Sequence, residues 1–363
     1  MDNLELITLT KSSLKDAITE DKYWNGTFQP PFSKNKAKWI LENDRASNED
    51  VIAILGYENH NIIALVYLVP DLIKSDNGKL KKIFWSQRWW VSDKYKDTVL
   101  STYIKSVSLN ACNNQVVVKF LGDGTKAYYE KQPFIKFAKR NRYIFVFSID
   151  HGLLINKKNS LQKVKPLLKL IDGLSRKIIA SLNKSKIKSK HFLTKNVEFI
   201  DDNIWFFIEK LCLEDLVPKS KDYINWQISN NQYEVIQDGL DKAGYKCLLN
   251  SISNKIYNIN TVVKFENEII GFISAYVSGN RFVIRYFVAN EPYYRDCVNV
   301  MIKNFIQSKC TILQTEDTKL GELINSSYFK VYSDVKELVS LKHNDIDINL
   351  NSKVVKDQDG NMF

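Results

Sequence analysis

The residue types that most often ligate metals or act as reactive thiols are few and scattered in this chain. The five cysteines show no CxxC spacing, and the four histidines stand singly, without an HExxH motif. An odd number of cysteines at such spacings favours reduced thiols in a cytosolic compartment over a disulfide framework or a zinc site. The sequence therefore predicts no metal cofactor. The positions are Cys112, Cys212, Cys247, Cys297, Cys310, His60, His151, His191 and His343.

A denser group of polar and aromatic side chains, AYYEKQPF, follows the strand-like apolar run QVVVKFLG. It places Tyr128 and Tyr129 beside the pair Glu130 and Lys131. A tyrosine on a short helix can be a packing residue or an acid, and this stretch alone leaves both readings open. The elements around it are needed to decide what it does.

Those elements occur twice. In PPFSKNKAKWILEND and VPKSKDYINWQISNN, matching residues such as Trp39 and Trp226 lie 187 positions apart. Downstream, ENHNIIALVYLVP is matched by FENEIIGFISAYV, and RWWVSDKYKDTVLSTYIKS by RYFVANEPYYRDCVNVMIKN. Three matches in the same order predict two copies of one fold. A chain of 363 residues is also longer than a single core usually supports.

Periodicity predicts the elements of the first copy. A hairpin is expected around Asn59-His60-Asn61, because these residues form a turn signal between two apolar runs. The expected strands are 4–9, 51–57, 62–69, 82–91, 115–120 and 142–149, and the expected helices are 12–19, 36–42, 97–109 and 125–132. The second copy repeats this order over 199–338 with a poorer opening.

This order resembles the GNAT (Gcn5-related N-acetyltransferase) superfamily. The stretch from Tyr129 to Phe134, YEKQPF, resembles the family's late Y-E-K-x-G-F element, with Pro133 in place of the glycine. The layout is similar in particular to tandem-GNAT proteins that accompany bacterial surface-polysaccharide genes, which have a Trp early in each copy and a helical connector. The resemblance implies an α/β fold with a mixed sheet, made of two GNAT-like domains in tandem joined by a basic helical connector.

The resemblance also implies a chemistry, in which an amine attacks the thioester of acetyl-CoA or another acyl-CoA. Backbone amides at the end of the fourth strand, Trp90 and Val91, would contact the thioester carbonyl. Tyr129 would protonate the leaving thiolate, and such acid catalysis typically contributes about 10²–10⁴ in rate. The first copy is the expected active one, because Ile324 stands where the second copy would need its tyrosine.

The pyrophosphate turn of the first copy would include Lys96, Thr98 and Val99, before a helix N-terminus whose free amides favour anions. This sequence departs from the family's glycine-containing turn, since it has no glycine there and places Asp97 beside the expected phosphates. The departure puts the cofactor site itself in question.

The predicted domains are 1–150, a connector at 151–195, a degenerate second copy at 196–342 and a polar tail at 343–363, for which flexibility is expected. The predicted function is an acyl-CoA-dependent N-acyltransferase acting on an amino sugar or another small amine in envelope polysaccharide synthesis. Two alternatives stay open: a Fem-type aminoacyl transferase that uses aminoacyl-tRNA, and a non-catalytic binding or scaffold protein.

The connector holds the chain's charge. Residues 157–195 contain twelve basic residues and a single acid, Asp172, which accounts for the whole net charge of +11. Its apolar residues follow a helical stripe. The basic face is a solvated surface, a dock for anionic lipid, or a contact for RNA. The longest apolar run, IIALVYLV, is too short to cross a bilayer, so a cytoplasmic protein is expected, with peripheral membrane contact left open.

Overall fold

The computed structural model describes residues 4–187, 192–235, 252–350 and 353–360. Cys247 and His191, and the connector residues Lys188 and Lys190, lie outside the described residues. The chain divides into two compact units. Unit 1 comprises residues 1–140, 209–256 and 338–363, and unit 2 comprises residues 141–208 and 257–337.

The two units have the same strand order. Unit 1 runs β1-β2-β3-β4-β5-β14, and unit 2 runs β7-β10-β11-β12-β13-β6. The strands of unit 1 are β1 (Leu4–Thr10), β2 (Val51–Glu58), β3 (Asn61–Lys74), β4 (Leu80–Val91), β5 (Val116–Val118) and β14 (Tyr332–His343). Those of unit 2 are β7 (Leu193–Asn196), β10 (Ile256–Phe265), β11 (Glu268–Ser278), β12 (Arg281–Ala289), β13 (Ile312–Thr315) and β6 (Phe134–Val146). This shared strand order is compatible with two copies of one fold, which stays a prediction.

Each unit takes its last strand from the other repeat. The end of β6 pairs with β13 in unit 2, and the end of β14 pairs with β5 in unit 1. In both units the neighbouring pair is parallel, β4 with β5 and β12 with β13, while the hairpin strands are antiparallel. Unit 1 contains residues 209–256 as well as the end of β14 from the second half of the chain, unlike the contiguous ranges expected from the sequence.

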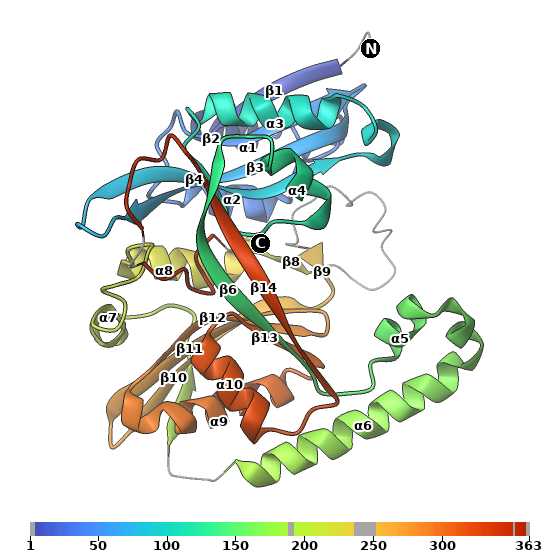
Figure 1. Ribbon diagram of the computed structural model, residues 1–363, viewed down its shortest axis with the longest axis vertical. Coiled ribbons are helices and arrows are strands. Elements are labelled where there is room, and N and C mark those ends of the chain that lie inside the picture. Colours follow the sequence, from blue (N-terminus) through green and yellow to red (C-terminus); the bar gives the residue numbers. More distant parts are fainter. Residues whose placement is uncertain (1–3, 188–191, 236–251, 351–352, 361–363) are drawn as a thin grey trace. The chain divides into compact units, whose positions relative to one another are not determined.

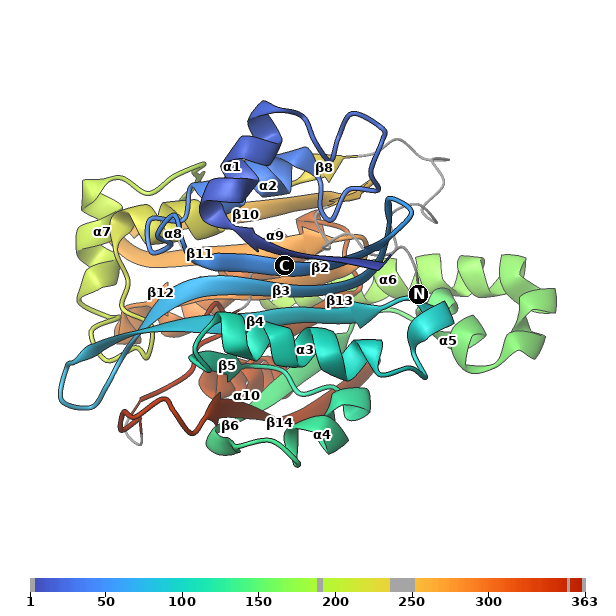
Figure 2. The same cartoon turned by 90° about the horizontal axis from the view of Figure 1, so that it is seen from above.

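Helices cover both faces of the unit 1 sheet. The helices α1 (Lys11–Thr19), α2 (Lys34–Leu41) and α8 (Lys221–Ile228) pack on one face, and α3 (Leu100–Ala111) packs on the other. Figure 2 shows α1 and α2 on the opposite side of β2, β3 and β4 from α3. Alternating side chains of the strands supply the two cores: Leu55 and Tyr67 face α1, α2 and α8, whereas Ile54 and Val66 face α3.

The repeated tryptophans meet in the core of unit 1. The rings of Trp39 on α2 and Trp226 on α8 stack with centroids 4.3 Å apart and planes 10° from parallel. Each indole donates a hydrogen bond to the other residue's carbonyl, Trp39 Nε1 at 2.6 Å and Trp226 Nε1 at 2.8 Å. This reciprocal contact buries both indoles without leaving their N–H groups unpaired.

The tight turns follow from their residues. Asn59 and His60 have positive φ values of 49° and 64°, which a two-residue hairpin loop requires, so the predicted hairpin is confirmed. Glu266 and Asn267, with φ of 49° and 70°, form the matching turn between β10 and β11 in unit 2.

The expectation of a flexible C-terminal tail is wrong for its described part. Asp357 and Asp359 are buried in unit 1. Lys219 Nζ lies 2.5 Å from Asp359 Oδ1, and Lys119 Nζ donates to the carbonyls of Lys356 and Asp357 at 2.8 and 2.7 Å. These contacts with the charged side chains of Lys119 and Lys219 fix the described part of the tail on unit 1.

Candidate functional site

The candidate site lies in unit 1, where β4 and β5 stop pairing. Their parallel register covers only Phe84 with Val116 and Trp85 with Val117. The rest of β4, from Ser86 to Val91, pairs with β3 on its other edge. After Trp85, the edge of β4 that faces β5 is therefore no longer paired with β5.

One backbone amide on this stretch can be assigned a direction. Ser92 N donates to Ile63 O at 2.7 Å, so it points toward β3. Neighbouring residues of a strand direct their amides to opposite edges, so the Val91 amide faces the edge that β5 leaves open. Trp90 N points back toward β3 by the same rule. Of the two residues expected to contact a thioester carbonyl, the geometry thus favours Val91.

Tyr129 ends α4 (Asp123–Tyr129), which follows β5. Its side chain is only 4% exposed, and its hydroxyl shares a hydrogen bond with Ser86 on β4. Burial raises its pKa above the ordinary value of tyrosine. A neutral phenol is therefore held beside β4 at neutral pH, which is the state that a proton donor needs.

Two residues that the sequence reasoning missed adjoin Tyr129. Lys105 on α3 is fully buried, and its Nζ donates to Ser86 Oγ at 2.9 Å. The same Nζ lies 5.7 Å from the centre of the Tyr129 ring. Burial lowers the pKa of Lys105 to about 7. Lys105, Ser86 and Tyr129 thus form a continuous hydrogen-bonded row that could carry a proton.

A signal for Lys105 was present in the sequence. The buried positions of α3 are Leu100, Ile104, Lys105, Ser108 and Leu109, so the lysine shares the phase of the apolar stripe. A lysine on the buried face of a helix lowers the stability of the fold unless it has a partner for its charge or is neutral. Helical periodicity alone is enough to recognise such a position. Ser86 has no comparable signal, since its partner follows only from the fold.

Aromatic rings pack around Tyr129. Trp89 lies edge-on to Tyr128, with centroids 4.9 Å apart, and Tyr129 lies edge-on to Phe134 at 5.0 Å. Trp89 Nε1 donates to Ser101 O at 3.1 Å, which ties the end of β4 to the first turn of α3. Tyr129 therefore packs among aromatic rings and also directs its hydroxyl to a polar partner, while its role as an acid stays a prediction.

The turn between β4 and α3 is largely exposed to solvent. Lys96, Thr98 and Val99 are all exposed, as is Asp97. Thr98 Oγ1 donates to Tyr95 O at 2.7 Å and accepts from Leu100 N at 3.3 Å. The amides of the next residues in the first turn of α3 have no partner within the helix. The turn could bind an anion, although the negative charge of Asp97 disfavours anion binding there.

In unit 2, the sequence comparison places Ile324 at the position of Tyr129. Ile324 on α10 (Thr318–Ser327) is buried in the core of this unit. A Cβ atom added to Gly321, on the same helix, would lie 2.4 Å from the ring of Tyr143 on β6. The helix therefore packs closely on the exchanged strand, and the position holds apolar side chains.

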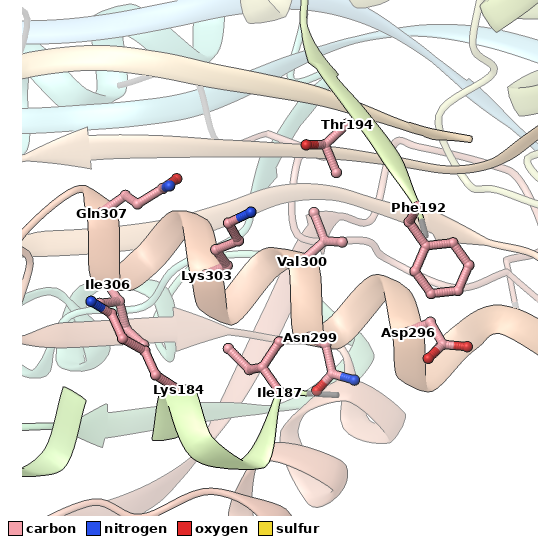
Figure 3. Close-up of a pocket in the computed structure, with 10 residues that line it drawn as sticks. All are labelled: Lys184, Ile187, Phe192, Thr194, Asp296, Asn299, Val300, Lys303, Ile306 and Gln307. Atoms are coloured by element: carbon pink, nitrogen blue, oxygen red, sulfur yellow. The ribbon is translucent and has the colours of Figure 1, made fainter. Parts of the chain in front are cut away.

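A separate cavity of about 390 Å³ lies in unit 2 beside α9 (Tyr294–Gln307). Figure 3 shows Asn299 and Lys303 of α9 among the lining side chains, with Phe192 and Thr194 and the end of α6 (Lys165–Lys186) around them. None of its lining residues belongs to β12 or β13. It is therefore distinct from the strand opening where the resemblance places a cofactor.

Two absences apply to the described part of the chain. It holds no group of three or more His, Cys, Asp or Glu side chains that could bind a metal ion. None of the helices in these same residues is both long and apolar enough to span a bilayer.

Comparisons with known proteins identify the fold. No family model and no curated protein matches the sequence. The structure of Saccharomyces cerevisiae N-myristoyltransferase with bound myristoyl-CoA matches 94% of this chain and 83% of its own, with a TM-score of 0.53 at 11% identity. A GCN5-related N-acetyltransferase from Anabaena variabilis matches 93% of this chain and 72% of its own, at 9% identity and a TM-score of 0.47.

Only the first of these two likenesses has a TM-score above 0.5, and at such identities a likeness establishes the fold and not the activity. The chain has a mixed α/β fold that is shared with the yeast N-myristoyltransferase.

Proposed function

We propose that this protein is an acyl-CoA-dependent N-acyltransferase whose active site lies in unit 1. The observation that carries the proposal is the row formed by Lys105, Ser86 and Tyr129 beside the open edge of β4. A buried neutral phenol next to a free backbone amide suits a reaction that needs a carbonyl polarised and a leaving group protonated.

In the proposed reaction, an amine nitrogen attacks the thioester carbonyl, a C–N bond forms, the C–S bond breaks, and the nitrogen releases one proton to water. The Val91 amide donates to the carbonyl oxygen as negative charge develops on it. Tyr129 gives its proton to the departing sulfur. The resulting phenolate regains a proton from Ser86, which is resupplied by Lys105. With a pKa of about 7, Lys105 exchanges that proton with little cost near neutral pH.

The turn before α3 is the proposed pyrophosphate contact. Lys96 supplies a positive charge, and the first-turn amides of α3 supply donors in a direction that the helix dipole favours. Thr98 and Val99 border this position. Because Asp97 adds a negative charge to the same turn, we expect weaker binding of acyl-CoA than a glycine-containing turn would give.

The acceptor class is proposed from the sequence resemblance. A small amine such as an amino sugar, used in envelope polysaccharide synthesis, is the substrate that the resemblance favours. A cytoplasmic enzyme at the inner side of the membrane would fit such a substrate.

A comparison of two tyrosine variants tests the proposal. Tyr129→Phe should lower turnover about 10²-fold or more while leaving acyl-CoA affinity nearly unchanged, because the lost proton acts in the transition state. Tyr128→Phe is the matched control, since Tyr128 belongs to the same aromatic group and has no part in the proposed proton transfer. Equal loss in both variants would contradict the role of Tyr129. Absence of acyl transfer with any amine would favour the non-catalytic alternative.

A further inference from the structure

The long helix α6, light green in Figure 1, carries an exposed row of large apolar side chains. Leu167, Leu170, Leu174, Ile178 and Leu182 are between 40% and 60% exposed. Their spacings of three and four residues confine them to an arc of about 120° on a helix of 3.6 residues per turn. We call this row the α6 stripe.

The α6 stripe is not the face by which the helix packs on unit 2. That contact uses a different arc: Asn183 Nδ2 donates to Phe329 O at 2.9 Å, and Ser175 Oγ accepts from Ile149 N at 2.9 Å. Ile179 packs against the core of unit 2 from the same side. One face of the helix therefore packs on unit 2, while the side chains of the α6 stripe are exposed to solvent.

Basic side chains occupy the remaining arc. Lys165, Lys169, Arg176, Lys177 and Lys184 lie between the packed face and the α6 stripe, and all except Lys165 are exposed. The one acid of the helix is Asp172, whose Oδ2 atom lies 2.7 Å from His151 Nδ1. Its carboxylate therefore points to His151 and not to the lysines of the helix. The solvent side of α6 thus joins an apolar row to a positive flank.

We propose that α6 docks on an anionic membrane surface, lying in its plane with the α6 stripe inserted and the basic flank on the headgroups. A helix with this division of side chains binds by burying its apolar face and by attracting anionic lipids. The helix is not apolar enough to span a bilayer, which agrees with in-plane binding. This inference goes beyond the proposed function and does not depend on it.

Charge distinguishes this partner from two others. A second copy packed through the same stripe would bring two positive flanks together, which is unfavourable. A nucleic acid would satisfy the lysines but would leave five large apolar side chains in water, and α6 contains no aromatic residue for stacking on bases. A membrane with anionic headgroups satisfies both the charge and the apolar row.

Vesicle sedimentation of the full chain tests the proposal. The protein should sediment with vesicles of phosphatidylcholine and phosphatidylglycerol and stay in solution with phosphatidylcholine alone. Binding should fall as salt shortens the screening length from about 10 Å at 0.1 M to about 3 Å at 1 M. Equal binding to neutral and anionic vesicles, or retention by RNA without vesicle binding, would overturn the proposal.

Two variants address the two parts of the surface. In the stripe variant, Leu170→Ser, Leu174→Ser and Ile178→Ser should weaken binding about tenfold or more. In the charge variant, Lys169→Gln, Lys177→Gln and Lys184→Gln should weaken it about 100-fold, because each basic group near an anionic surface contributes about fivefold. All six side chains are exposed, so thermal melting should show that both variants stay folded.

Matched controls lie in unit 1. Leu80→Ser with Leu213→Ser removes apolar side chains of similar exposure, and Lys15→Gln, Lys38→Gln and Lys79→Gln together remove the same charge as the charge variant. Both controls should bind vesicles like the wild type. Loss of binding in the controls to the same extent as in the α6 variants would show that binding follows overall composition, and would contradict docking through α6.

Discussion

Replacing Lys105 with Met should change how the stability of unit 1 depends on pH. Lys105 is fully buried, and burial lowers its pKa from an ordinary 10.5 to about 7. Below pH 7 the folded protein must hold a buried charge. Between pH 7 and the ordinary lysine pKa, the unfolded chain binds a proton that the folded protein does not. Stability therefore rises with pH across this window.

The size of the effect follows from the two pKa values. Between pH 7 and pH 9, a group with pKa 7 when folded and 10.5 when unfolded adds about 2 kcal/mol to the free energy of unfolding. Lys105→Met removes this group and keeps a side chain of similar length. The wild type should therefore gain about 2 kcal/mol relative to the variant as the pH is raised from 7 to 9.

Urea unfolding followed by tryptophan fluorescence measures this difference, because six of the seven tryptophans belong to unit 1. The thiols Cys112 and Cys212 have pKa values raised to about 12 by burial, but they are common to both proteins and cancel in the comparison. Lys15→Met, which replaces an exposed lysine of unit 1, should follow the wild type. Parallel curves for wild type and Lys105→Met would refute the shifted pKa and remove the proposed proton source.

Three further changes should have distinct effects. Trp226→Ala should lower the free energy of unfolding of unit 1 by about 3–5 kcal/mol, since it leaves a cavity against Trp39 and removes the hydrogen bond from Trp226 Nε1 to Trp39 O; urea unfolding measures it. Lys219→Met should cost about 3–5 kcal/mol by leaving the charge of Asp359 buried without its lysine partner, and Asp359→Asn in the same protein should recover part of that loss. Asp97→Asn should strengthen acetyl-CoA binding in calorimetry, because it removes a negative charge from the proposed pyrophosphate turn.

Local signals in the sequence predicted the local structure. The hairpin around Asn59 and His60 follows from a two-residue turn that needs positive φ, and the apolar runs on either side of it set the strands. The strand that ends the first repeat was expected at 142–149 and instead begins at Phe134. Its first half is FIKFAKR, whose lysines and arginine hide the strand from a hydropathy pattern.

Contacts between distant parts of the chain were outside the reach of periodicity. The match between Trp39 and Trp226 in the sequence indicated equivalent positions, but their direct stacking depends on α8 joining unit 1. The exchange of β6 and β14 likewise depends on pairings between distant parts of the chain. The same limit applies to the site, because Tyr129 could be singled out from the sequence whereas its partner Ser86 required the fold.

The central claim is that unit 1 binds an acyl-CoA beside Tyr129, and a calorimetric titration of the wild-type chain with acetyl-CoA tests it most directly. The proposal predicts saturable heat with one site per chain, because the proposed active site lies in unit 1 alone. It also predicts that Asp97→Asn binds more tightly and that Tyr129→Phe binds like the wild type. No heat even at millimolar acetyl-CoA would contradict the claim, whatever the geometry around Tyr129.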